Sequence, residues 1–255
     1  MKKKIKFIIT LITLIIICIT SLGCDEDWLT NFFVKRANNA LLASEYFIYI
    51  CDEEDGVAQI MGLTDKGKEQ EYLIIPEKIE GFSVTHIGYG NGIFATAIIE
   101  KFGVGHANLQ SENLKKVFFI NNVIIDEGFG KLLDCPLLEG VFFISEKYYR
   151  LPLSYSNING WNQVVSNVSY FYNYDIAPND NYYWIDNYDY GEKIEFIPPE
   201  PTREGYIFDG WYKESECINK WNFGEDTLPQ AQYDENEKQV YQETKLYAKW
   251  IKIGG

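Results

Sequence analysis

Histidine and cysteine, which supply many metal sites and catalytic nucleophiles, are scarce in this chain of 255 residues. It has two histidines, His86 and His106, and neither has a cysteine, a second histidine or an acid at metal-ligand spacing. A Gly-x-Ser-x-Gly nucleophile motif is also absent. We therefore expect a protein that is not an enzyme, with no catalytic residues, no metal and no cofactor.

The five cysteines include no Cys-x-x-Cys pair. Two lie near the N-terminus, and the other three, Cys51, Cys135 and Cys217, are far apart in the sequence. We expect these three to be small buried apolar side chains rather than a disulfide framework.

Basic residues are few: 23 Lys and Arg stand against 37 Asp and Glu, a net charge of −14. Residues 1–23 hold four lysines and no acid, so the chain without them carries −14 − 4 = −18. Because binding to phosphates needs a basic surface, this balance argues against a nucleic-acid partner.

The apolar run at the N-terminus, Phe7–Ile19, has 13 residues. It is too short to cross a bilayer of ~30 Å as a helix, but it suits the core of a signal peptide. The run leads into Ser21-Leu22-Gly23-Cys24, which resembles a bacterial lipoprotein cleavage site. The resemblance implies a lipoprotein signal peptide over 1–23, lipid attachment at Cys24, and anchoring to the outer face of the cytoplasmic membrane at the bacterial cell surface. The alternative is an ordinary secretory signal with an incidental cysteine.

The segment 24–51 begins at this cysteine. Acids at 25–27 precede apolar residues at helical spacing through residue 44. This pattern predicts an anchor segment and an amphipathic helix over 25–48 that caps the next domain.

A seven-residue stretch occurs twice. Leu114–Ile120 reads Leu-Lys-Lys-Val-Phe-Phe-Ile, and Leu138–Ile144, 24 residues later, reads Leu-Glu-Gly-Val-Phe-Phe-Ile. A recurrence at this interval predicts a stacked solenoid in which each coil contributes a strand.

The surrounding residues resemble the BspA-like leucine-rich repeats of bacterial surface proteins. The matching positions are Leu73, Ile75, Pro76, Cys135, Leu138, Val141 and Phe143. The resemblance implies a short, irregular leucine-rich repeat solenoid over 52–155, followed by a linker over 156–167.

Alternation along a strand assigns Val117 and Phe119 to the core and turns Phe118 outward. Because neighbouring coils are ~4.8 Å apart, Phe118 is expected to stack on Phe142 of the next coil. Phe118 and Phe142 are therefore candidate partner-binding residues. The alternative is that this ladder only stiffens the sheet or is covered by the C-terminal part of the chain.

The C-terminal third holds the most specific motifs. Gly205–Tyr212 reads Gly-Tyr-Ile-Phe-Asp-Gly-Trp-Tyr, Trp221 follows, and Leu246–Trp250 reads Leu-Tyr-Ala-Lys-Trp. These motifs resemble the Listeria–Bacteroides repeat, the internalin B-type repeat. The resemblance implies a small β-grasp-like module over 168–252, of a kind found in extracellular and wall-associated proteins. We expect its aromatic residues to fill a small core.

Within this module, strands are expected over 168–174, 182–186 and 193–196. Tyr183 and Trp184 are candidate partner-binding residues that stack on sugars, although their alternation fits sheet packing as well. The acids of this tyrosine-rich region are expected to be solvated turn residues rather than Ca²⁺ ligands: Asp175, Asp180, Asp186 and Asp189.

The sequence thus predicts a mainly β protein, a leucine-rich repeat solenoid followed by a β-grasp-like module. The predicted function is a surface-anchored lipoprotein that acts as a non-catalytic protein-interaction or adhesion module. The alternative is a carbohydrate-binding accessory protein that uses the tyrosine-rich module. The expected partners are the membrane, through Cys24, and a host or bacterial surface protein or glycan.

Overall fold

The computed structural model describes residues 42–87, 109–121, 123–125, 135–151 and 162–254. Cys24, the expected signal peptide and the expected helix up to residue 41 lie outside these residues. The described chain is mainly β, and its helices are the four-residue α3 (Asp65–Lys68) and the 3-10 turn η3 (Asn179–Asn181). No helix in this part of the chain has the length and apolar character needed to cross a membrane.

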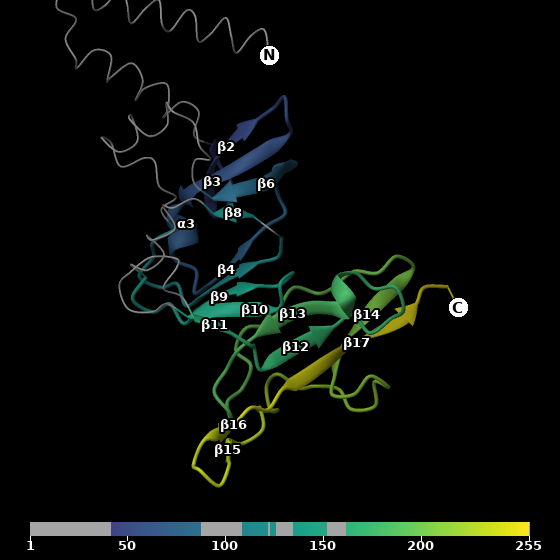
Figure 1. Ribbon diagram of the computed structural model, residues 1–255. Helices are drawn as coiled ribbons and strands as arrows, with labels where there is room; N and C mark the ends of the chain where they lie inside the picture. The colour runs from purple at the N-terminus through teal and green to yellow at the C-terminus, as the bar shows by residue number, and fades with distance from the viewer. Residues whose placement is uncertain (1–41, 88–108, 122, 126–134, 152–161, 255) are drawn as a thin grey trace, which may run out of the picture.

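The N-terminal sheet is the first of three main sheets (Figure 1). Its strand order is β1 (Leu42–Ala43), β2 (Phe47–Asp52), β3 (Val57–Leu63), β6 (Phe82–Ile87) and β5 (Lys78–Ile79), with β8 (Ile124–Ile125) paired to β6. The prediction of a helix reaching residue 48 is wrong, because 42–43 and 47–48 lie in strands. The run Tyr46–Ile50 is rich in aromatic and β-branched residues, which favour a pleated strand over a helix.

The central sheet has the strand order β11 (Asn162–Val164), β10 (Tyr148–Leu151), β9 (Gly140–Phe143), β7 (Lys116–Phe119) and β4 (Tyr72–Ile75). β4, β7 and β9 are parallel, and Phe118 lies directly opposite Phe142. The predicted stacking of these two rings is confirmed, with centroids 4.9 Å apart. Along the chain, β3, β6 and β8 join the N-terminal sheet, while β4, β7 and β9 join the central sheet.

The central sheet is buried on both faces. Val117 and Phe119 face a core shared with the N-terminal sheet, as their alternation predicted. Phe118 and Phe142 face a second core shared with the C-terminal part. All four residues of β7 and of β9 are buried as a result, which accounts for their nearly continuous apolar sequence.

The C-terminal sheet has the order β13 (Tyr182–Asp186), β12 (Val168–Phe171), β17 (Thr244–Lys252) and β14 (Tyr206–Tyr212). β12 and β17 are parallel, and the other pairs are antiparallel. A small hairpin, β15 (Gln232–Tyr233) and β16 (Gln239–Val240), stands apart in the lower part of Figure 1. The prediction of a strand over 193–196 is wrong, because these residues form a loop.

A bulge in β14 places two aromatic rings on the same side of this sheet. Phe208 lies opposite Trp250 and Trp211 lies opposite Ala248, so β14 advances three residues while β17 advances two. Gly210 in the bulge has a φ of +110°, which glycine adopts at no steric cost. The rings of Phe208 and Trp211 meet edge to face with centroids 5.1 Å apart, and Trp211 is 3% exposed.

Candidate functional site at the junction of the central and C-terminal sheets

One stretch of the C-terminal part contacts the central sheet. We call residues 179–196 the junction segment, which comprises η3, β13 and the loop that follows. The ring centroids of Trp184 and Phe196 lie 4.8 and 5.0 Å from that of Phe118. Phe196 also stacks on Tyr72 of β4, at 5.0 Å. Since aromatic pairs contribute ~0.5–1.5 kcal/mol each beyond the area that they bury, this cluster holds the two sheets together.

This packing corrects the prediction that Phe118 and Phe142 face a partner. Their side chains are 0% and 1% exposed, because the junction segment covers the face that alternation turned outward. The structure instead agrees with the alternative, in which the C-terminal part of the chain covers the stacked rings of Phe118 and Phe142.

A buried ion pair lies beside the aromatic cluster. The Nζ of Lys116 in β7 is 2.8 Å from Oδ1 of Asp186 in β13, and the two side chains are 2% and 0% exposed. Nζ also donates a hydrogen bond of 2.8 Å to the backbone oxygen of Asn187. Desolvation of a charge is costly, so each member of this pair is tolerated because the other is present.

Tyr188 completes this arrangement. Its ring centroid is 3.6 Å from the Nζ of Lys116, a cation–π contact. Its hydroxyl donates to Oδ2 of Asp186 at 2.8 Å and accepts from the backbone N–H of Phe196 at 3.0 Å. Burial raises the pKa of Asp186, while Lys116 and the hydrogen bonds from the Tyr188 hydroxyl and the Asn187 N–H act in the opposite direction. Burial and the nearby Asp186 raise the pKa of the Tyr188 hydroxyl.

The sequence interpretation missed this polar cluster. Asp186 was expected in a solvated turn, and Lys116 was not singled out at all. The signal was present in the alternation, because Lys116 lies two residues before Phe118 and therefore shares its face of the strand. Once that face is buried, the lysine requires a buried anion.

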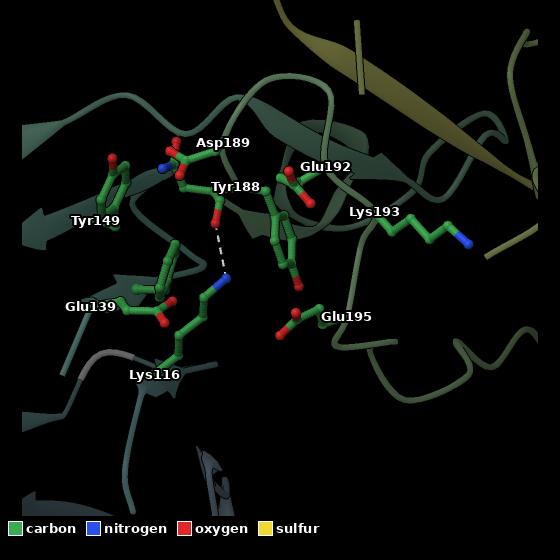
Figure 2. Close-up of a pocket in the computed structure, with 10 residues that line it drawn as sticks. Lys116, Glu139, Tyr149, Tyr188, Asp189, Glu192, Lys193 and Glu195 are labelled. Carbon is green, nitrogen blue, oxygen red and sulfur yellow. Dashed lines mark hydrogen bonds between the residues drawn. The ribbon is translucent and has the colours of Figure 1, made fainter. Parts of the chain in front are cut away.

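A pocket of about 400 Å³ opens next to the ion pair (Figure 2). Phe142 and Tyr149 form one wall, and Lys116 and Tyr188 line its inner part. Charged and polar residues complete the lining: Glu139, Asn187, Asp189, Glu192, Lys193 and Glu195. Figure 2 shows the side chain of Lys193 directed away from Lys116, and its Nζ donates to the backbone oxygen of Gly224. Carboxylates therefore dominate the accessible charge of the pocket.

The other two candidate residues, Tyr183 and Trp184, are not arranged as a sugar platform. Trp184 is 2% exposed and packs on Phe118, so the expectation that it meets a partner is corrected as well. Tyr183 is half-buried, stacks on Trp211 with centroids 5.6 Å apart, and donates a hydrogen bond to the backbone oxygen of Pro199. Within the described residues, no group of three or more His, Cys, Asp or Glu side chains could hold a metal ion.

The aromatic motifs of the C-terminal sheet are shared with a known family. Residues 168–249 match the Listeria-Bacteroides repeat domain. The chain carries a Listeria-Bacteroides repeat domain. This domain is an extracellular surface repeat, consistent with a role in surface interactions. No curated protein matched the chain in a sequence comparison. The repeat domain contains the whole junction segment, so its first part is also the part that binds the central sheet.

Proposed function

We propose that this protein is a surface-anchored, non-catalytic binding protein of a bacterium, held at the outer face of the cytoplasmic membrane by a lipid on Cys24. The presence of a Listeria-Bacteroides repeat domain over 168–249 carries this proposal, because that domain is an extracellular surface repeat. The charged run and the Gly-Cys site at the N-terminus support the anchor.

The proposal includes a BspA-like leucine-rich repeat unit over 52–155. The alternation of the chain between two sheets supports it, because successive turns of a solenoid add parallel strands to the same sheets. Parallel stacking of β4, β7 and β9 fits successive coils. The unit and the repeat domain share the second core, so we propose that they act as one binding body.

Two experiments test the proposal. In the native host, an alkyne fatty acid should label the wild-type protein and leave Cys24→Ala unlabelled; equal labelling of both would remove the anchor. The immobilised ectodomain, residues 25–255, should enrich a macromolecule from bacterial or host surface fractions. A column carrying an unrelated protein of similar acidity is the control, and equal recovery on both columns would contradict a binding role.

A second candidate, glycan binding, is supported by an aromatic row on the C-terminal sheet. Cross-strand pairing aligns Tyr182, Phe171, Tyr247 and Tyr212 across all four strands. Phe171 stacks on Tyr247 with centroids 5.3 Å apart, and both are half-buried. A glycan array should then show binding that Tyr247→Ala reduces. Tyr183→Ala should leave the binding unchanged, because the Tyr183 side chain already packs on Trp211 and bonds to Pro199. An array without any signal would remove this candidate.

A further inference from the structure

The junction pocket contains carboxylates that form no ion pair within the described chain. Glu139 lies in the turn before β9, and Asp189 and Glu192 lie in the junction segment. These three residues are exposed, and within the described residues their side chains form no ion pair or hydrogen bond. The fourth carboxylate, Glu195, accepts a hydrogen bond from the Tyr72 hydroxyl at 3.0 Å. Like charges around one pocket repel each other, and a bound cation relieves that repulsion.

The nearby cations are already engaged. Lys116 is paired with Asp186, Lys193 donates to Gly224, and Lys115 pairs with Glu71 at 3.0 Å. The pocket is thus negative at its mouth, and a basic ligand complements it.

Tyr149 provides a second and independent indication of a ligand. Its side chain lines the pocket and is 4% exposed, and its hydroxyl makes no hydrogen bond within the described residues. The hydroxyl oxygen is not one of the fully enclosed polar atoms that lack a partner, so it opens on the pocket and is free to contact a ligand. Burial raises the pKa of this hydroxyl to about 12, with Asp186 and Asp189 contributing, so it stays neutral and can accept a bond from an ammonium group.

The arrangement also limits the kind of cation. The carboxylates do not converge on one point, as the absence of a three-residue metal group among the described residues shows. Spaced carboxylates match several positive charges on one extended molecule better than a single ion. The wall of Phe142 and Tyr149, whose stacked rings have centroids 4.9 Å apart, suits the methylene stems of lysine or arginine side chains. The volume of about 400 Å³ accommodates one or two such side chains.

We infer that the junction pocket binds a basic, lysine- or arginine-rich segment of a partner protein. This inference rests on the proposed binding function and specifies the chemistry of the partner. The rim carboxylates of Glu139, Asp189 and Glu192 pair with the cationic groups. The Tyr149 hydroxyl accepts a hydrogen bond from the deepest of them, and the ion pair of Lys116 and Asp186 holds the two walls at a fixed separation.

Fluorescence anisotropy with a labelled hexalysine peptide and the ectodomain, residues 25–255, tests the inference at low and moderate salt. We expect Glu139→Gln combined with Glu192→Gln to weaken binding by about tenfold or more, because two charge pairs are lost. The matched control is Glu225→Gln combined with Glu235→Gln, which makes the same charge change at exposed positions outside the pocket. It should stay within about twofold of the wild type. Tyr149→Phe, which removes only the hydroxyl, should weaken binding by a few fold.

Equal losses in the two double variants would overturn the inference, because binding would then reflect the overall negative charge. Absence of binding at low salt, or binding of spermidine without binding of the peptide, would overturn it as well. Circular dichroism checks the fold of each variant, and Asp189→Asn, on the exposed loop, replaces the double variant if that variant is unfolded. If surface fractions yield a partner that the Glu139 and Glu192 double variant retains fully, the proposed function stands and this inference fails.

Discussion

Lys116 and Asp186 are 70 residues apart in the sequence and form a buried charge pair with 2.8 Å between Nζ and Oδ1. One residue belongs to the central sheet and the other to the repeat domain. Their pairing ties the orientation of the two sheets to a buried polar contact within an aromatic interface. Such pairs add little net stability over apolar residues, but they penalise any arrangement that separates the charges.

Removal of one partner of this ion pair should strongly destabilise the fold. Asp186→Asn or Lys116→Met leaves an uncompensated buried charge or polar group, and we expect a loss of about 3–5 kcal/mol in the free energy of unfolding. Urea unfolding followed by tryptophan fluorescence measures it. The double variant Lys116→Met, Asp186→Asn should lose less than the sum of these two single changes. Strict additivity in this cycle would show that the two side chains are not coupled.

Acid titration should reveal the direction of the Asp186 shift. Burial raises its pKa in the folded state above the ordinary value of about 3.9. Its contribution to stability is then fully present below the unfolded-state pKa and is lost as the pH rises through the folded-state pKa. The unfolding free energy of the wild type minus that of Asp186→Asn should therefore fall as the pH increases from about 3.5. A difference that grows over this range would indicate a lowered pKa instead.

Alkaline titration addresses a buried tyrosine. Burial raises the pKa of Tyr149, which is 4% exposed, to about 12. The stabilisation linked to this hydroxyl is present below pH ~10, where unfolded tyrosine ionises, and is lost as the pH approaches 12. Absorbance at ~295 nm should show that part of the tyrosine signal ionises only as the protein unfolds. A single titration near pH ~10 with the fold intact would contradict the burial of this residue.

The bulge in β14 should depend on glycine at position 210. Gly210→Ala places a Cβ at a φ of +110° and 2.5 Å from Cε of Lys220. The lysine end can move away, so the backbone conformation sets the cost, about 1–3 kcal/mol. Gly224→Ala is the control, because that residue has no positive φ and the nearest atom to its added Cβ would be Oδ1 of Asn222, 3.3 Å away. Thermal unfolding of both variants measures the difference, and similar midpoints would argue against a conformational requirement at Gly210.

The aromatic interface should be a major source of stability. Phe118→Ala removes a ring with 0% exposure that contacts Phe142, Trp184 and Phe196. We expect a loss of about 3–5 kcal/mol from the transfer and cavity costs. Ile218→Ala, at a residue that is 73% exposed, should stay within about 0.5 kcal/mol of the wild type. If Phe118→Ala were as mild as this control, the two sheets would not be held together by the ring cluster.

The sequence predicted which side chains of a strand share a face of the sheet. It did not predict which of the two faces is buried by another part of the chain. It predicted the stacking of Phe118 on Phe142, because a repeat of 24 residues brings equivalent positions side by side. It also led to the prediction that both rings face a partner. Alternation assigns side chains to the two faces of a strand, but it does not show which face is exposed to solvent. Here the junction segment, which begins 61 residues after Phe118 and 37 residues after Phe142, covers the second face.

Local pattern also failed where charge and long-range packing interact. Asp186 ends a strand in a region rich in Asp, Asn and Tyr, and such composition favours a turn at the surface. Its burial depends on Lys116, a residue from another sheet. The sequence next to Asp186 therefore does not predict that this side chain is buried. By contrast, the Gly-Trp-Tyr and Leu-Tyr-Ala-x-Trp motifs predicted the repeat, because their spacing is specific to that family.

The parallel pairing of β12 with β17 has a mechanical consequence. These are the first and the last strand of the repeat domain. They are hydrogen-bonded side by side, with Val168 opposite Thr244 at one end and Phe171 opposite Tyr247 at the other. A tensile force that pulls the start of β12 away from the end of β17 acts along both strands, so it loads these hydrogen bonds together in shear. An antiparallel hairpin pulled at its ends would instead open one bond at a time. The topology of the domain thus resists stretching along the chain, a property that the proposed anchoring at a cell surface would use.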